Sequence, residues 1–319
     1  MKDHYGRKIN YMRLSITDLC NLRCVYCMPE EGVAKHAHIQ NLSFEEMLDL
    51  VKAGVSLGID KIRLTGGEPL VRKGVVELVR EIGKIPGIKD LTMTTNGILL
   101  PKYAKELKKA GLQRVNISLD TFDPQKYHQI TRWGQIEDVL AGIEAAREAG
   151  MHPIKINTVL INGFNDDEIE TFVNFTKDHE VDVRFIELMP LGESSGFAEN
   201  KYLSNDEVIK RMPALEPVIE LDKSGPAEYY RLPGAKGKVG LINPISKQFC
   251  KLCNRIRVTA DGKIKPCLHS DREIDIVALL KEGKTYEEIL LQAIGEKPEQ
   301  HHINENEKQL LRNMNEIGG

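Results

Sequence analysis

Short strand-like runs alternate with helical segments through the first two thirds of the chain, and this alternation constrains the fold more than any other feature. The strand-like runs are Arg13–Thr17, Lys61–Leu64, Leu91–Thr95, Val115–Leu119, Ile154–Leu160 and Val183–Leu188. The helical patterns between them are Ser43–Ser56, Gly74–Ile85, Pro101–Ala110, Ile136–Ala149 and Asp166–Lys177. Such alternation predicts an α/β fold with a parallel sheet, which right-handed crossovers curl toward a partial barrel. An open, doubly wound sheet is the competing architecture, and periodicity does not exclude it.

The sequence pattern changes at about residue 215, where turn-rich segments replace the regular alternation of strand-like and helical segments. Strand-like pieces follow at Val239–Ile242 and Arg255–Thr259, and Asp261-Gly262 predicts a hairpin turn. Helical patterns return at Ile274–Leu280 and Tyr286–Ile294. We therefore expect two parts: a barrel-like domain over residues 1–215, and a smaller α+β extension over 216–319.

Composition narrows the function classes. A formal net charge of −3 over 319 residues provides no global basic field for nucleic acid. The first 16 residues contain no apolar leader, and no run approaches membrane-spanning length. Six cysteines without an export signal predict a cytoplasmic protein whose thiols serve as ligands or redox groups rather than disulfides.

Three of the six cysteines, Cys20, Cys24 and Cys27, lie together just after the first predicted strand. The carboxyl ends of strands are where α/β barrels build active sites. A structural zinc site or a closed four-cysteine cluster needs four ligands. Three thiolates on a four-iron cluster leave one iron open to a small molecule, which indicates one-electron chemistry. A zinc site completed by a distant ligand is the alternative.

The remaining cysteines, Cys250, Cys253 and Cys267, form a second set of three. We expect a second cluster with an open iron, while a zinc site completed by His269 is the alternative. Close by, Arg255 and Arg257 alternate with apolar residues, so both side chains face one way on a strand. Lys61 and Arg63 repeat this pattern, and Arg13 has the same phase on the first strand. Arginines beside an open metal position indicate a fixed anionic ligand such as phosphate.

The first cysteine set, with the aromatic Tyr26 before its last member, resembles the radical S-adenosylmethionine superfamily. Gly66-Gly67-Glu68-Pro69, after the second strand, is similar to that superfamily's methionine-binding motif. This resemblance favours an incomplete (βα)6 TIM-like barrel. We find no Rossmann GxGxxG after a strand and no P-loop.

Both cysteine sets and the Arg-x-Arg pair resemble one branch of the superfamily, the GTP 3′,8-cyclase family of molybdenum-cofactor biosynthesis. Further segments that carry the resemblance are Gly6-Arg7-Lys8-Ile9, Arg13–Asp18, Met28-Pro29, Lys61–Leu70, Thr94–Gly97, Ser118–Asp120 and Arg312–Gly319. Position 19 is Leu where many members have Arg, and Gly74 stands where an acidic residue is commoner. Neither departure falls on a residue that the resemblance assigns to a ligand.

The resemblance implies a lyase with two [4Fe-4S] clusters and S-adenosyl-L-methionine as cofactors. It implies cofactor contacts at Tyr26, Gly67, Ser118 and Met189. It implies GTP contacts at Arg13, Lys61, Arg63, Thr94, Lys155, Arg184, Arg255 and Arg257. A catalytic role is implied for the terminal Gly318 and Gly319, which would reach the site behind a helical stretch at Glu305–Asn315. A frayed terminus is the alternative for this tail.

The implied reaction removes a hydrogen from C3′ of GTP with a 5′-deoxyadenosyl radical, after which C3′ attacks C8. Its product is (8S)-3′,8-cyclo-7,8-dihydroguanosine 5′-triphosphate. The implied partners are an electron donor such as flavodoxin or ferredoxin and the cyclic pyranopterin monophosphate synthase that takes the product; a homodimer is also allowed. Two rival interpretations are a peptide-modifying radical enzyme and a non-catalytic iron–sulfur electron carrier.

Overall fold

The computed structural model describes the chain except for residues 33–40, 193–194, 199, 221–224, 302–311 and 319. Within the described ranges, no helix is both long and apolar enough to cross a membrane.

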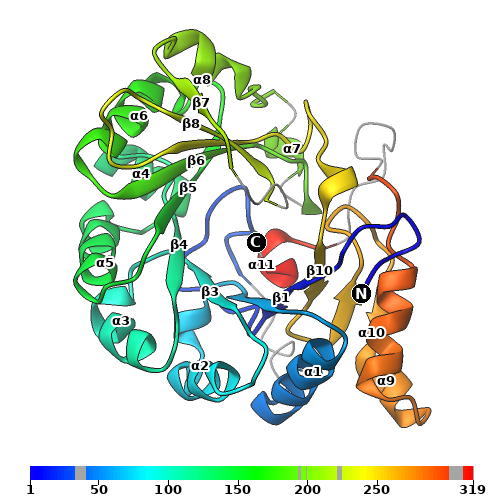
Figure 1. The fold of residues 1–319 in the computed structure, drawn as a ribbon. Coiled ribbons are helices and arrows are strands. Elements are labelled where there is room, and N and C mark those ends of the chain that lie inside the picture. The colour runs from blue at the N-terminus through cyan, green and yellow to red at the C-terminus, as the bar shows by residue number, and fades with distance from the viewer. Residues whose placement is uncertain (33–40, 193–194, 199, 221–224, 302–311, 319) are drawn as a thin grey trace.

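Six parallel strands form the centre of a single curved sheet (Figure 1). They are β1 (Tyr11–Ser15), β2 (Lys61–Thr65), β3 (Asp90–Thr95), β4 (Arg114–Ser118), β5 (Ile154–Leu160) and β6 (Val181–Glu187). They lie side by side in chain order, as right-handed βαβ units require. The expected strands are confirmed, with boundaries that differ by no more than a few residues.

The C-terminal part continues this sheet at both edges. β9 (Val239–Ile242) pairs in parallel with β6, and β10 (Arg255–Val258) pairs in parallel with β1. Antiparallel strands complete the two edges: β8 (Ala227–Arg231) and β7 (Glu216–Val218) beyond β9, and β11 (Lys263–Lys265) and β12 (Ile274–Asp275) beyond β10. The predicted hairpin at Asp261-Gly262 is confirmed, since Val258 pairs with Ile264.

Helices cover the outer face of the sheet (Figure 1). They are α1 (Phe44–Ser56), α2 (Val75–Gly83), α3 (Leu100–Lys109), α4 (Pro124–Thr131), α5 (Ile136–Glu148) and α6 (Ile169–Asp178). Ser43 and Glu46 form the predicted capping box of α1. Gly111 and Gly150 adopt positive φ angles of 107° and 73° just after α3 and α5, as expected for left-handed helix ends.

Some elements differ from the sequence-based expectations. The expected helix Asp166–Lys177 is a 3-10 turn, η3 (Asp166–Glu168), followed by α6. The expected helix Ile274–Leu280 begins two residues later as α9 (Ile276–Lys281), because the Asp275 carboxylate accepts from the Ala278 amide at 2.9 Å and caps the helix there. Helix α4, the short β7 and β8 strands, α7 (Ser195–Ala198) and α8 (Asp206–Arg211) were not expected.

Alternate residues along the strands divide the interior into two environments. On β1 and β2, Met12, Leu14, Ile62 and Leu64 are fully buried against the outer helices. The residues between them are polar or cationic and face the concave side of the sheet, where α11 (Met314–Ile317) lies (Figure 1). The concave side is therefore built for a polar ligand.

Candidate active site

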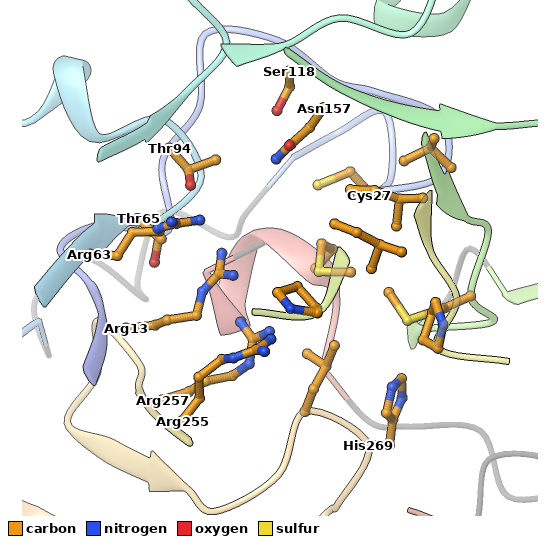
Figure 2. Close-up of a pocket in the computed structure, with 18 of the residues that line it drawn as sticks. Arg13, Cys27, Arg63, Thr65, Thr94, Ser118, Asn157, Arg255, Arg257 and His269 are labelled. Carbon is orange, nitrogen blue, oxygen red and sulfur yellow. The ribbon is translucent and has the colours of Figure 1, made fainter. Parts of the chain in front are cut away.

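A cavity of about 320 Å³ lies within the curve of the sheet. This volume is at the lower end of the range for small-molecule sites. All six cysteines and the four residues expected to contact S-adenosylmethionine, Tyr26, Gly67, Ser118 and Met189, line it. Of the expected GTP contacts, those that line it are Arg13, Arg63, Thr94, Arg184, Arg255 and Arg257. In Figure 2, Arg13, Arg63, Arg255 and Arg257 point into the cavity from one side, and Cys27 lies across from them.

The first cysteine set lies on the compact loop after β1. The Cys27 amide donates to the Cys24 carbonyl at 2.9 Å, and the Leu22 amide donates to the Cys20 sulfur at 3.4 Å. Burial raises the pKa of Cys20 to about 11 and that of Cys27 to about 12, and a neighbouring thiolate adds to the rise at Cys27. Buried thiols with raised pKa values gain stability when a metal replaces their protons.

The Gly66-Gly67-Glu68-Pro69 segment packs directly on the backbone that precedes the cysteine loop. A Cβ at Gly66 would lie 2.3 Å from the Thr17 carbonyl oxygen, and one at Gly67 would lie 2.4 Å from that of Leu19. These glycines are therefore required for the close approach of the two segments. Leu19 is 39 % exposed, and its carbonyl accepts from the Glu68 amide at 2.7 Å, so its role here is through the backbone.

Glu68 holds the start of the next loop. Its buried carboxylate accepts from the Thr95 hydroxyl at 2.8 Å and the Asn96 amide at 2.7 Å, and burial raises its pKa to about 7. The Asn96 side chain in turn contacts the Cys20 sulfur at 3.9 Å. The motif thus links strand ends β2 and β3 to the first cysteine set.

Tyr26 is fixed by a hydrogen bond from its hydroxyl to Asp120, at 2.5 Å. Burial raises the pKa of Asp120 to about 6, although the bonds from Tyr26 and the Val159 amide oppose the rise. This pair connects the cysteine loop to the end of β4 and leaves the Ser118 side chain facing the cavity (Figure 2).

The second cysteine set spans a longer stretch. Cys250 begins the 3-10 turn η5 (Cys250–Leu252), Cys253 precedes β10, and Cys267 follows β11. Burial raises the pKa of Cys250. Burial also acts to raise the pKa of Cys253, but the charges of Lys297 and Arg255 outweigh it and lower that pKa to about 7.

A row of arginines crosses three neighbouring strands. The sheet register places Arg13 opposite Arg257 on one side and Arg63 on the other. Burial lowers the pKa of all three, to about 10 for Arg63 and Arg257, and the mutual repulsion of Arg13 and Arg257 adds to the fall at Arg13. Clustered guanidinium groups in a buried cavity are stabilised by a polyanionic ligand.

Other expected GTP contacts have protein partners. Lys155 donates to the Tyr229 hydroxyl at 2.8 Å and lies 3.5 Å from the Asp182 carboxylate. Arg184 donates to the Asn157 side chain at 2.5 Å. Lys155 and Lys61 do not belong to the cavity lining, and their role toward a ligand stays a prediction.

The chain end reaches the arginine row. The Gly318 carbonyl accepts from Arg257 at 3.0 Å and from Arg13 at 3.3 Å. Gly318 has φ +74°, and a Cβ there would lie 2.2 Å from the Thr65 hydroxyl oxygen. Arg312 anchors the tail through ion pairs with Asp261 at 2.8 Å and Glu273 at 2.6 Å. Most of the expected helix Glu305–Asn315, and Gly319, lie outside the described residues; the helix observed is α11.

Sequence reasoning missed several polar residues of the barrel interior. Tyr11 lines the cavity with a buried hydroxyl, and Asn116, which is fully buried on β4, lies in register between Thr94 and Lys155. Both Tyr11 and Asn116 occupy strand positions whose side chains alternate toward the concave side of the sheet, and this alternation in the sequence would have identified them. Lys297 follows a helix end, and nothing local in the sequence indicates that its side chain is buried.

The cysteine sets fit iron–sulfur clusters in the chemistry of their donors. All six cysteines are free thiols that line the cavity, three from each set. In the part of the chain that the structure describes, no three Cys, His, Asp or Glu side chains group around a single metal ion. A cluster distributes its thiolates over different irons.

Comparison with known proteins agrees with this geometry. Residues 14–176 match the model of the radical SAM superfamily, and residues 181–303 match the molybdenum cofactor synthesis C model. A crystal structure of Streptococcus suis SuiB shares the fold at a TM-score of 0.61 and 15% identity, over 91% of this chain and 66% of that one.

Curated relatives are far more similar. GTP 3′,8-cyclase of Alkaliphilus oremlandii is 56% identical over 100% of both chains. The enzyme of the same name from Peptoclostridium acidaminophilum is 57% identical over 99% of this chain and 98% of its own. The chain therefore belongs to the radical S-adenosylmethionine superfamily and, within it, to the GTP 3′,8-cyclase family.

Proposed function

We propose that this protein is a GTP 3′,8-cyclase, which carries out the first step of molybdenum-cofactor biosynthesis. The observation that carries the proposal is a single cavity lined both by six free cysteines in two sets of three and by a row of buried arginines. The full-length similarity to enzymes of that name supports it. A peptide-modifying radical enzyme gains no support from the relatives.

Cys20, Cys24 and Cys27 would hold the cluster that, with S-adenosylmethionine, supplies a 5′-deoxyadenosyl radical. Gly67 would contact that cofactor, and it keeps the cysteine loop in place, because a side chain at this position would collide with the Leu19 carbonyl. Tyr26, fixed by Asp120, and Ser118 and Met189 would complete its pocket. Cys250, Cys253 and Cys267 would hold the second cluster, which would offer an open iron for binding the guanine ring.

The basic residues hold GTP and orient its ribose. A triphosphate needs several cations before it leaves water, and Arg13, Arg63 and Arg257 present three in one register. Arg255, Arg184 and Thr94 extend this wall, and Lys61 and Lys155 would join it on binding. The protein's contribution is to place C3′ of the ribose beside the radical source and to exclude water, so that the C3′ radical attacks C8 of guanine.

Further assignments, some from the family and some from the sequence pattern and composition, remain predictions. They are a flavodoxin or ferredoxin as electron donor, delivery of the product to cyclic pyranopterin monophosphate synthase, a homodimer, a cytoplasmic location and a division into domains at residue 215.

Anaerobic product analysis tests the proposed function. The reconstituted protein should contain about eight irons, as two four-iron clusters require. With GTP, S-adenosylmethionine and a strong reductant it should form 5′-deoxyadenosine and the cyclised nucleotide together. Equal deoxyadenosine formation with GTP present and absent, and no cyclised product, would contradict the proposal. Stoichiometric zinc with about four irons would contradict the second cluster.

A further inference from the structure

A buried lysine from the far end of the chain lies against the second cysteine set. Lys297 is only 3% exposed. Its ammonium donates to the carbonyl oxygens of Arg255 and Pro266, each at 2.8 Å. Both acceptors adjoin cysteines of the set, because Arg255 is two residues after Cys253 and Pro266 immediately precedes Cys267.

The charge of this ammonium also acts on the nearby Cys253. An ammonium has three N–H groups, and lysine is almost never fully buried unless it is paired. The two carbonyls carry only partial charge. A hydrogen bond and the charge of Lys297 both stabilise the Cys253 thiolate. Lys297 therefore joins two cysteine-bearing segments and places a full positive charge at one of the sulfurs.

A second cation holds the remaining cysteine to the same segment. Arg7 donates to the Cys250 carbonyl at 3.0 Å, and also to the Glu299 carbonyl at 2.8 Å and the Pro298 carbonyl at 2.6 Å. Its position is fixed by an ion pair with Asp3 at 2.6 Å. The segment 297–299 is therefore connected to all three cysteine segments by hydrogen bonds. Lys297 bonds to the segments that carry Cys253 and Cys267, and Arg7 links Cys250 to residues 298 and 299.

We propose that Lys297 is a positioning residue of the second iron–sulfur site. Its ammonium holds the Cys253 and Cys267 segments at the spacing that a cluster requires and compensates the charge of the Cys253 thiolate. This inference rests on the proposed function only in assigning a cluster to these cysteines. Groups that hydrogen-bond to cluster sulfurs and neutralise their charge favour the reduced cluster, so Lys297 should raise its reduction potential.

The experiment compares two buried lysines near the same loop. Lys265 is 2% exposed, donates to the Ser270 carbonyl at 2.5 Å and lies 3.4 Å from Glu273, and so is paired with a carboxylate. Lys297→Met and Lys265→Met remove the same charge with the same change of shape. Each is made in the full-length chain with Cys20, Cys24 and Cys27 replaced by alanine, so that the second cluster gives the whole signal in an EPR-monitored redox titration.

For Lys297→Met we expect at least a tenfold fall in the reduction equilibrium constant, a shift of about 59 mV for a one-electron couple. Loss of the cluster, seen as about four fewer irons, would equally support the proposal, provided Lys265→Met retains its irons. Lys297→Arg should restore most of the potential, because it keeps the charge. Thermal unfolding of the two methionine variants checks that a general loss of stability does not cause the difference.

Two results would overturn the inference. One is a Lys297→Met variant that keeps the cluster at an unchanged potential. The other is a Lys265→Met variant that shows the same shift or loss. Absence of a second cluster from the chain with Lys297 intact would overturn the cofactor assignment of the proposed function, and this inference with it. The titration contains no GTP, so a failure of GTP turnover alone leaves its result unaffected.

Discussion

The two cysteine sets face one cavity but are built in opposite ways. The first occupies a single loop of eight residues. Glu68 acts to raise the pKa of Cys20 and Asp120 that of Cys27, while Arg23, from the same loop, acts to lower that of Cys20. The second is spread from Cys250 to Cys267 over a turn and a hairpin, and cations from distant segments lie beside it. One set is thus defined by local sequence and the other by tertiary contacts.

The difference indicates that the two cysteine sets have separate roles in the reaction. A cluster in a buried site with carboxylates nearby resists added electrons, so an electron placed there is strongly reducing. That property suits cleavage of a sulfonium. The second set lies beside Arg255 and the arginine row, where a polyanionic substrate would bind. We therefore expect the first set to serve radical formation and the second to serve substrate binding.

Cysteine replacement should separate the two roles completely. Cys24→Ala should abolish 5′-deoxyadenosine formation, because the first cluster loses a ligand. Cys253→Ala should retain the first cluster and some deoxyadenosine formation but lose the cyclised nucleotide. Iron counting and liquid chromatography of both products check this. Equal loss of deoxyadenosine in both variants would mean that the two sets do not divide the reaction.

Removing the chain end should have the next largest effect. Gly318 contacts Arg13 and Arg257 through its carbonyl, so the tail bridges the arginine row and the cysteine loop, where the Met314 amide donates to the Cys27 carbonyl at 3.2 Å. Deletion of Gly318 and Gly319 should leave fold and iron content intact while cyclisation collapses. A synthetic peptide of about the last dozen residues should restore part of it, because the effect is one of binding.

A matched substitution sharpens this test. Gly318→Ala keeps the chain length but places a Cβ 2.2 Å from the Thr65 oxygen at a positive φ, so it should mimic the deletion. Gly163→Ala, at φ +67° with open space around its Cβ, controls for backbone strain alone. Full activity of the deleted protein would make the tail a frayed end.

The sequence predicted the local features of this molecule well and the long-range ones poorly. The strands, most helices and the Ser43 capping box depend on periodicity and short-range hydrogen bonds, and all were found. The sequence predicted that the arginines on each strand face the same way. Only the register of β10 with β1 shows that Arg257 lies beside Arg13. Lys297 lies 44 residues beyond Cys253, so no local pattern could connect them. The β7 and β8 strands at the sheet edge are short and half-exposed, which leaves little periodicity to recognise.

Substrate affinity tests whether the cations of the second region bind GTP. Each lost charge-assisted contact should weaken binding by roughly 1.5–3 kcal/mol. An Arg255→Ala, Arg257→Ala double variant should therefore bind GTP about two to four orders of magnitude more weakly, since 1.36 kcal/mol is tenfold. Equilibrium dialysis under anaerobic conditions measures this. Exposed Arg231, on the β8 strand, provides the control substitution. Unchanged affinity in the double variant would confine these arginines to a structural role.

The smallest expected effect tests the electrostatic contrast directly, in protein from which the clusters have been removed. The thiolate is the nucleophile, and Cys253 with a pKa of about 7 is half ionised at neutral pH, whereas Cys27 with a pKa of about 12 is almost fully protonated. The greater intrinsic reactivity of the more basic thiolate offsets part of this advantage, which leaves Cys253 roughly a hundredfold faster toward iodoacetamide.

The pH dependence of this alkylation tests the same contrast. The alkylation rate of Cys253 should fall about tenfold per pH unit below pH 7 and should level off above pH 8, as its thiolate fraction does. Mass spectrometry of peptides after timed alkylation measures both cysteines in one sample, and Lys297→Met should slow Cys253 without changing Cys27. Equal rates at the two cysteines would show that the cations beside the second set do not stabilise its thiolate, and the contrast between the two regions would then be one of chain connectivity alone.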